Sequence, residues 1–563
     1  MENQRVAQIF QEIGDILELK GENRFRYLSY HRAAQTLLNL SKDIRKIYDN
    51  GELEGIPGIG KALAEKIAEI LNTGKCGTHE RLLAEFDKGL LELLTIRGLG
   101  PKKIKKFYDE LGIDNIGKLK TAAEKGVLAD LERMGEKSQA DILKAIQEHE
   151  KHVARSHLIT ATFLAEFLIG YMKDCSKVSR AEYAGSLRRG RETVGDIDIL
   201  ATGKDHNQII RHFLAHQDVS LVLAQGETKA SVILEGGVQV DLRVVDEKSF
   251  GAALYYFTGS KNHNIATRKL AIKKGLKINE YGVFKGEKSI AGKTEKEIFK
   301  VLGLPYIIPE LREDQGEVQA GFDGKLPKSV ELADIRGDLH LHTNWSDGRN
   351  TLEEMVAAAQ KLGYEYLCVS DHSTSARIAN GLDLGRIKDQ IKQVEALNKR
   401  LRGFKVFKGA EVDILTDGSL DFPDEILAQL DWITASVHSK FTLSSAEQTA
   451  RLIKAISNPY VHVLGHPTGQ IVNRREPYEL DIAAVARAAA KNNVALEINS
   501  NMRLDLSATN IRIAKEHGVK FVINTDAHSI DQLGLMRFGV TTARRGWLEK
   551  GDVLNTLPIE ALD

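Results

Sequence analysis

The part of the chain beyond residue 334 carries a dense set of histidines and carboxylates inside short apolar runs. Side chains at the ends of separate strands converge when those strands close into a barrel. A set so rich in imidazole and carboxylate favours a cluster of Mn, Zn or Fe ions over one structural zinc. Its members are Asp338, His340, His342, Asp347, Asp371, His372, Glu411, His438, His466, Asp526 and His528.

A second group of carboxylates lies earlier in the chain. Asp196 and Asp198 are two residues apart on an expected strand, so both carboxylates project from one face. Such neighbours repel each other unless a divalent cation lies between them, and Mg²⁺ binds carboxylates of this kind together with substrate phosphates. Asp241 offers a third carboxylate, which allows a second metal and activation of an attacking hydroxyl. The glycine-serine turn at residues 185–190 can present N–H and hydroxyl donors to a triphosphate, and Arg189 adds positive charge.

The composition indicates several domains but does not identify a binding partner, which must be inferred from local clusters of charge. A chain of 563 residues suggests three to five domains. Its 78 basic and 78 acidic residues cancel, so total charge neither favours nor excludes nucleic acid. Three cysteines without a paired motif fit a reducing cytoplasm. The N-terminus is charged and amphipathic rather than a signal sequence, and no apolar run reaches membrane-spanning length. We therefore expect a cytoplasmic protein without a membrane partner, with a monomer as the default.

Hydrophobic periodicity divides the chain into three parts. Residues 1–155 have helical spacing, and residues 178–245 contain strand-like runs. A polar stretch at residues 313–329 is typical of a linker. After it, short strands alternate with long helical runs, which favours an α/β barrel.

Two glycine turns in the helical part are candidates for gripping a nucleic-acid backbone. Each precedes an expected amphipathic helix, so that backbone N–H groups at the helix start can face an anion. Phosphate contacted in this way is bound without reading sequence. An ordinary turn between helices explains one copy equally well, whereas two copies followed by lysines favour DNA. The candidate contacts are Gly58, Gly60, Gly98, Gly100, Lys102 and Lys103.

Lys66 lies on the helix after the first of these turns, and Tyr30 is a second candidate in the same region. A lysine with a lowered pKa next to a sugar aldehyde can form a Schiff base. A solvated helix lysine is the other interpretation, and the residues alone leave both open.

Three segments together resemble the family X DNA polymerases: residues 185–200, 238–245 and 255–260. The helical part with its helix-hairpin-helix turns matches the same family, so the resemblance covers about residues 1–315. It implies that Asp196, Asp198 and Asp241 are catalytic and bind two ions, Mg²⁺ or Mn²⁺. It further implies contacts to the incoming dNTP, with two aromatic residues excluding a 2′-hydroxyl. The implied nucleotide-binding residues are Gly185, Ser186, Arg189, Tyr256, Phe257, Gly259, Asn264 and Arg268.

The same resemblance bears on Lys66, which falls on the family's Schiff-base lysine for removing a 5′ deoxyribose phosphate. Its surroundings depart from the pattern, because Phe25, Ala62 and Thr78 stand where lyase-active relatives have basic residues. Further along the chain, residues 261–277 hold six basic residues and no acidic one, consistent with a nearby duplex backbone or with a solvated helix face.

Residues 334–563 resemble the polymerase and histidinol phosphatase (PHP) domains. The motifs are HLHTNWSDG, SDHS, GAEVDI, SVHS, GHP and TDAH. The family fold is a distorted barrel with its ligands at the C-terminal strand ends. The resemblance implies two or three ions, Mn²⁺ or Zn²⁺, with Glu411 bridging two of them. Every ligand position is kept, so an active phosphoesterase is expected. The implied ligands are His340, His342, Asp347, His372, Glu411, His438, His466, Asp526 and His528.

Residues around these ligands have expected supporting roles. Asp338 and Asp371 would orient ligands. Arg377, Arg474 and Arg503 lie in loops just past ligand-bearing strands and are candidates for clamping phosphates, with plain surface arginines as the equal alternative.

The expected fold class is multidomain: an N-terminal all-α helix-hairpin-helix region, an α+β nucleotidyltransferase palm and a C-terminal α/β distorted barrel. The expected boundaries are 1–85 (lyase-like, first helix-hairpin-helix), 86–155 (DNA-binding, second helix-hairpin-helix), 156–245 (palm), 246–312 (nucleotide-selecting), 313–333 (linker) and 334–563 (PHP).

The expected function is filling short gaps during DNA repair on gapped or primer-template DNA. The PHP domain would add a 3′-5′ exonuclease, with abasic-site endonuclease or 3′-phosphatase as further activities. Three alternatives stay open: a non-catalytic metal-stabilised scaffold at the C-terminus, a small-molecule phosphatase, and a nucleotidyltransferase acting on RNA ends or antibiotics.

Overall fold

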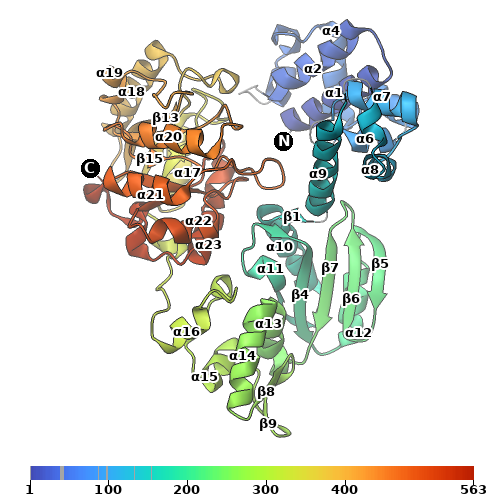
Figure 1. Cartoon of the computed structure of the whole chain (residues 1–563), viewed down its shortest axis with the longest axis vertical. Helices are drawn as coiled ribbons and strands as arrows, with labels where there is room; N and C mark the ends of the chain where they lie inside the picture. Colours follow the sequence, from blue (N-terminus) through green and yellow to red (C-terminus); the bar gives the residue numbers. More distant parts are fainter. Residues whose placement is uncertain are drawn as a thin grey trace. The chain divides into compact units, whose positions relative to one another are not determined.

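The computed structural model describes residues 2–38, 44–85, 88–94, 96, 99–131, 134–153 and 155–562. The chain divides into two compact units, Met1–Ala154 and Arg155–Asp563 (Figure 1). Across the described ranges, no helix combines the length and apolar character needed to cross a bilayer.

The described residues of the first unit form helices joined by short turns. Two apolar cores hold them, one including Phe10 and Ile67 and the other including Phe107 and Leu119. The helix expected over residues 61–71 is confirmed as α4, and α7 follows the second glycine turn. The helices are α1 (Glu2–Leu19), α2 (Arg24–Leu38), α3 (Ile44–Asp49), α4 (Lys61–Thr73), α5 (Gly77–Glu85), α6 (Lys88–Leu93), α7 (Pro101–Leu111), α8 (Ile116–Glu124) and α9 (Glu136–Val153).

The second unit begins with a palm built on a five-stranded sheet of order β2-β4-β7-β6-β5. Alternation along β4 puts Ile197 and Ile199 into the core shared with α10 and α12, so Asp196 and Asp198 project from the opposite face. The elements are β1 (Ser156–His157), α10 (Leu158–Asp174), β2 (Val178–Tyr183), α11 (Gly185–Arg188), β3 (Thr193–Val194), β4 (Asp196–Gly203), α12 (His206–Leu214), β5 (Val219–Gln225), β6 (Lys229–Leu234) and β7 (Gln239–Val244).

The next part of the unit runs from α13 to α16 and is called the thumb-like segment. Its core includes Tyr255 and Phe299. At one end of this segment Glu295 accepts hydrogen bonds from Arg188 and Arg312, which joins the segment to the palm turn. The stretch expected as a linker contains α16, whose Glu317 is buried against His263 at 2.6 Å. The elements are α13 (Phe250–Thr258), α14 (Lys261–Lys273), β8 (Lys277–Asn279), β9 (Gly282–Lys285), β10 (Lys288–Ala291), α15 (Glu295–Leu302) and α16 (Glu317–Phe322).

The rest of the second unit is a parallel barrel of seven strands in sequence order, β11 to β17. A parallel bridge between Leu341 and Ala527 joins the first strand to the segment after the last one, so the barrel is nearly closed. The α/β barrel expected from the sequence is confirmed. The strands are β11 (Gly337–Leu341), β12 (Tyr366–Val369), β13 (Lys405–Asp413), β14 (Trp432–Ser436), β15 (Val463–Leu464), β16 (Ala495–Asn499) and β17 (Phe521–Asn524).

Helices surround this barrel and cover the outer faces of its strands, which explains why most strand residues are apolar and buried. These helices are α17 (Leu352–Lys361), α18 (Leu384–Asn398), α19 (Asp424–Leu427), α20 (Ser445–Ile456), α21 (Ile482–Lys491), α22 (Ala508–Lys515) and α23 (Met536–Arg545). The boundaries expected between the individual domains stay predictions.

Candidate functional sites

The three palm carboxylates meet on one face of the sheet. Strands β4 and β7 run parallel, with Asp198 directly opposite Asp241. One oxygen from each of Asp196, Asp198 and Asp241 lies within 4.8 Å of the others. Gln239 donates from Nε2 to both oxygens of Asp241, at 3.2 and 3.3 Å, and so fixes the direction of that carboxylate.

The electrostatics of this trio fit a divalent cation. Burial, reinforced by the charges of Asp196 and Asp241, raises the pKa of Asp198 to about 7. Three carboxylates this close oppose one another's ionisation unless positive charge compensates them. Oxygen donors converging from two strands are also the ligands that Mg²⁺ and Mn²⁺ prefer. The residues present therefore suit the two ions expected from the sequence.

A cavity of about 870 Å³ opens in front of these carboxylates. Most of the nucleotide-binding residues expected from the sequence line it, including Gly185, Ser186, Asn264 and Arg268. Gly185 has a φ of +63°, and a Cβ there would lie 2.3 Å from Asp198 Oδ2. Only glycine therefore allows the turn to approach the carboxylate so closely.

Arg189 lies in the same cavity and already has two partners. Its Nε is 3.0 Å from Glu313 Oε1, and its Nη1 donates to the carbonyl of Thr258. These contacts hold the guanidinium between the palm turn and the thumb-like segment. A bound triphosphate would compete with Glu313 for this charge.

The aromatic pair expected to contact the nucleotide is held by cations from two elements. The guanidinium of Arg268 lies 5.5 Å from the ring centre of Tyr256, and that of Arg243 lies 4.4 Å from Phe257. Asn264 donates to the carbonyl of Tyr256 at 2.8 Å. Its buried Oδ1 has no hydrogen-bond partner among the described residues, so an acceptor remains free beside the cavity.

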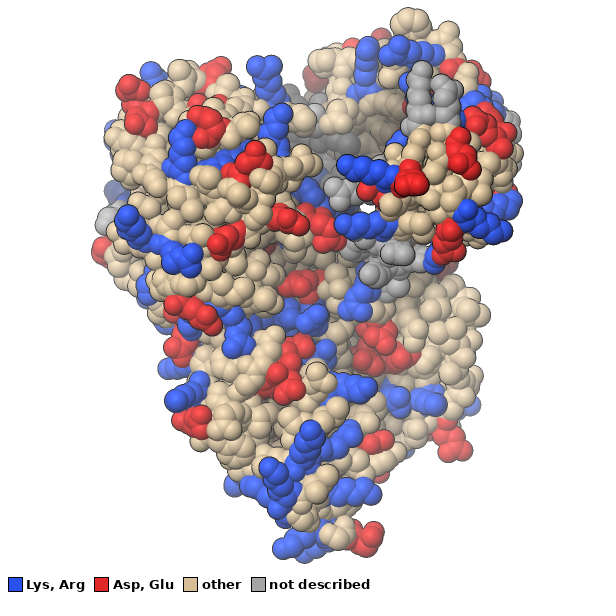
Figure 2. All heavy atoms as spheres, in the orientation of Figure 1, with Lys and Arg blue, Asp and Glu red and all other residues tan. Residues whose placement is uncertain are grey.

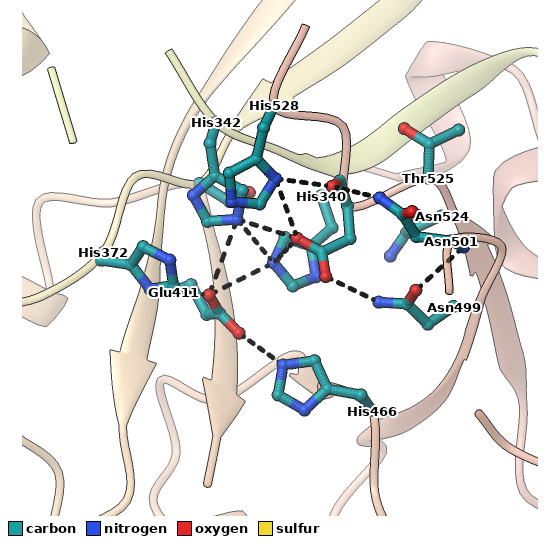
Figure 3. A network of polar contacts seen from close by, with 12 residues as sticks. His340, His342, His372, Glu411, His466, Asn499, Asn501, Asn524, Thr525 and His528 are labelled. Atoms are coloured by element: carbon teal, nitrogen blue, oxygen red, sulfur yellow. Dashed lines mark hydrogen bonds and ion pairs between the residues drawn. The ribbon is translucent and has the colours of Figure 1, made fainter. Parts of the chain in front are cut away.

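The second cluster lies at the carboxyl ends of the barrel strands and is centred on Glu411 (Figure 3). Its Oε1 is 2.8 Å from His466 Nε2 and 3.3 Å from His438 Nε2. Its Oε2 is 2.9 Å from His372 Nδ1. One carboxylate thus contacts imidazoles with both oxygens, which is the arrangement that a bridging ligand requires.

Two further carboxylates complete this cluster. Asp526 Oδ1 is 3.1 Å from His342 Nε2, and Asp347 Oδ1 is 3.4 Å from His528 Nε2. His340 Nε2 lies 3.5 Å from Glu411 Oε2. The structure therefore brings together all nine ligands expected from the sequence. Seven of them form overlapping groups with the geometry of a metal site: His340, His342, Asp347, His372, Glu411, His438 and His528.

The buried carboxylates of this cluster favour positive charge on two of its imidazoles. Burial alone would lower the pKa of His340, but Glu497 and the neighbouring carboxylates hold it well above its ordinary value. Burial also opposes protonation of His438, yet Glu411 and Asp413 raise its pKa to about 10. Within the described chain, the buried Nδ1 of His342 has no hydrogen-bond partner. Imidazoles that take up protons to neutralise buried carboxylates are suited to exchange those protons for Mn²⁺ or Zn²⁺.

Several supporting residues were missed from the sequence. Glu497 on β16 is fully buried and 2.6 Å from His340 Nδ1, and it also accepts from the backbone N–H of His466 at 2.8 Å. Asp413 contacts His438 Nδ1 in the same way. For Glu497, the available signal was a carboxylate inside a short, mostly apolar run, where an unpaired charge is unfavourable.

Asp371, Asp338 and Arg503 lie close to the ligands, and their expected roles stay predictions. Asp371 accepts from the N–H and hydroxyl of Thr343, at 2.8 and 2.6 Å, in the loop after β11. Asp338 accepts from the N–H of Thr525, next to Asp526. Arg503 Nε lies 3.6 Å from Asp526 Oδ2, so this arginine reaches the cluster itself.

The glycine turns of the helical unit have the expected local geometry. Gly58 has a φ of +84°, and Gly60 and Gly100 are the residues immediately before α4 and α7. Lys102 and Lys103 follow in the first turn of α7. Gly98 lies outside the described residues. Lys66 lies on α4, with Nζ 3.4 Å from the carbonyl of Ala62, and its expected lyase role stays a prediction.

Charge is distributed unevenly over the second unit. The lower end of Figure 2, where Figure 1 places α14 and β8, is dominated by basic side chains. The basic residues within 261–277 are all exposed: Lys261, Arg268, Lys269, Lys273, Lys274 and Lys277. This surface can contact a nucleic-acid backbone.

Comparison with known proteins identifies the family. Four family models match: a helix-hairpin-helix domain (residues 1–76), a helix-hairpin-helix tandem (90–148), the DNA polymerase beta thumb (253–313) and the PHP domain (338–501). The chain is 40% identical to "DNA polymerase/3'-5' exonuclease PolX" of Bacillus subtilis over 100% of its own length and 99% of that protein. It belongs to the bacterial family X DNA polymerases with a PHP domain.

Two further relatives are named as probable phosphatases and match a little over a third of the chain. A "Probable phosphatase" of Caldicellulosiruptor bescii is 31% identical over 35% of the chain and 81% of its own length. A probable phosphatase of Thermoanaerobacter sp. (strain X514) is 32% identical over 39% of the chain and 89% of its own length.

Proposed function

We propose that this chain is a template-dependent DNA polymerase that fills short gaps, with a 3′-to-5′ exonuclease in its PHP domain. The observation that carries the proposal is the convergence of Asp196, Asp198 and Asp241, the first two of which line a cavity together with the glycine-serine turn and the side chains expected to contact a nucleotide. The name of the Bacillus subtilis relative supports both activities.

In the polymerase site, the chain's own groups divide the work. Ser186 and the turn amides hold the triphosphate, with Arg189 adding charge. Tyr256 and Phe257 pack against the sugar. Asp241 lies where it can accept the proton of the primer 3′-hydroxyl, which attacks the α-phosphate in line while pyrophosphate leaves. Two divalent cations, when bound, supply the charge that stabilises the attacking and leaving oxygens.

In the PHP site, hydrolysis of a phosphodiester follows from the cluster around Glu411. Glu497 and Asp413 orient imidazoles, and Arg503 holds a phosphate oxygen. Bound Mn²⁺ or Zn²⁺ ions supply Lewis acidity. The probable phosphatases among the relatives favour 3′-phosphatase as an added activity, and abasic-site endonuclease is a further proposal.

One experiment tests both halves. A duplex with a labelled one-nucleotide gap is incubated with Mn²⁺, with and without dNTPs. Asp241→Ala should abolish extension and leave degradation, whereas His340→Ala combined with His342→Ala should do the reverse. Loss of both activities in either folded variant would contradict two independent sites. Retained degradation without the two histidines would favour the non-catalytic scaffold for the PHP domain.

A 5′ deoxyribose phosphate lyase at Lys66 is kept as a secondary proposal. Tyr30, the second candidate of this region, is buried and packs edge-on against Phe10 with ring centres 5.5 Å apart. Phe25 is 84% exposed at a position that is basic in lyase-active relatives. Borohydride trapping of an abasic substrate by wild type, lost in Lys66→Ala, tests it, and no trapping by wild type excludes it.

A further inference from the structure

Helix α23 of the PHP barrel also contacts the palm and the thumb-like segment. One face of the helix belongs to the barrel core through residues such as Val540. On the other side, Arg537 makes a bidentate pair with Glu166 of α10 at 2.7 and 3.0 Å. Arg544 Nε lies 2.9 Å from Glu310 Oε1, just after the thumb-like core.

The last residue of this helix reaches the turn that carries the nucleotide-binding groups. Arg545 is 6% exposed, and its Nη1 donates to the carbonyl of Gly190 at 3.1 Å. The same nitrogen lies 3.7 Å from Glu192 Oε1. A buried guanidinium therefore holds the end of the turn from the PHP side.

The turn itself leaves little room to move against α23. Gly190 has a φ of +66°, and a Cβ there would lie 2.1 Å from Thr541 Cγ2. Within the turn, the amide of Gly190 donates to Leu187 and that of Arg191 to Ser186, at 2.9 and 3.1 Å. Any shift of Gly190 is thus passed to Ser186.

We propose that Arg545 is a positioning residue for nucleotide binding, so that the PHP domain builds part of the polymerase site. This inference rests on the proposed polymerase function. Arg545 touches no nucleotide. It fixes Gly190, and through the turn it aims Ser186 and Arg189 at the triphosphate. A positioning residue of this kind sets the geometry of the binding site, and a displacement of the binding groups by about 1 Å already weakens their function.

The test compares Arg545→Met with Arg537→Met, a matched change on the same helix that breaks a palm contact away from the turn. In gap filling, we expect Arg545→Met to raise KM for dNTP about 10-fold, the size of one charge-assisted hydrogen bond, with kcat changed less than about 2-fold. Arg537→Met should leave KM within about 2-fold. Exonuclease activity should persist in both, because the barrel cluster is untouched.

Hydrogen exchange supplies a readout that needs no catalysis. Amides of residues 188–191 should exchange about 10-fold faster in Arg545→Met, with no change in Arg537→Met. Equal KM and equal exchange in the two variants would overturn the proposal. Should Arg545→Met fail to fold, Arg545→Gln, which removes the charge and shortens the side chain, decides in the same assays: an unchanged KM overturns the proposal and a raised one supports it. If wild type does not polymerise, the proposed function fails, whereas hydrogen exchange still tests whether Arg545 holds the turn at Gly190.

Discussion

The carboxylate of Glu295 joins the palm turn to the thumb-like segment, and replacing it by glutamine should destabilise this region. Its carboxylate accepts from Arg188 Nη1 and Nη2 at 2.8 and 2.7 Å, from Arg312 Nη1 at 2.6 Å and from Tyr306 at 3.1 Å. Although burial opposes ionisation, Arg188 and Arg312 lower the pKa of Glu295 to about 2.

The magnitude follows from that value. The difference from the ordinary pKa of 4.5 corresponds to about 3 kcal/mol in favour of the folded, charged form. Removing one partner of a buried ion pair costs about 3–5 kcal/mol. Both routes agree, so Glu295→Gln should destabilise this region by about 3 kcal/mol. Because the pKa is lowered, the stabilisation is fully present above pH 4.5 and is lost as pH falls toward 2.

Hydrogen exchange of the α15 amides measures this directly. A loss of about 3 kcal/mol should accelerate exchange roughly 100-fold. Glu287→Gln provides the control, because it makes the same replacement at an exposed residue that is not part of the Glu295 hydrogen-bond network. In wild type, protection corrected for intrinsic rates should fall between pH 4.5 and 2, and this fall should be absent in Glu295→Gln. Equal exchange in the two variants at neutral pH would refute the assigned energy.

Four further outcomes are expected. Glu497→Gln should weaken Mn²⁺ binding at the PHP site about 10–100-fold in equilibrium titration, and unchanged affinity would remove its orienting role. Gly185→Ala should reduce extension at least about 100-fold while hydrolysis persists, because its Cβ would displace Asp198; near-normal extension would count against the turn geometry. Without metal, the stability of the protein should decline as pH rises from about 4 to 7, because burial and neighbouring carboxylates raise the pKa of Asp198. Mg²⁺ should therefore raise the melting temperature more at pH 8 than at pH 5. Equal rises at the two pH values would argue against coupled carboxylates. Tyr256→Ala should raise ribonucleotide incorporation about 10-fold or more in single-turnover assays. An unchanged preference for dNTP over rNTP would show that another residue excludes the 2′-hydroxyl.

The sequence was most informative where chemistry depends on short-range pattern. His340 and Asp198 each belong to motifs within one strand, and strand periodicity decides which face they occupy. The parallel barrel followed from alternating strands and helices. These features need no knowledge of distant contacts.

Other features depend on contacts that no local pattern encodes. Strand β5 is an exposed edge strand, so its side chains lack the alternation that marks a half-buried strand in the sequence. Glu497 lies on a buried strand, and its role depends on His340 from far along the chain. Arg545 ends an ordinary amphipathic helix, and only the fold brings it to Gly190.

The central claim is that two separate cation clusters form, one on the palm and one at the barrel mouth. Anomalous diffraction from crystals grown with Mn²⁺ tests it most directly. The structure predicts one set of peaks among Asp196, Asp198 and Asp241 and another around Glu411. Absence of peaks at either position, in crystals saturated with the ion, would contradict the account.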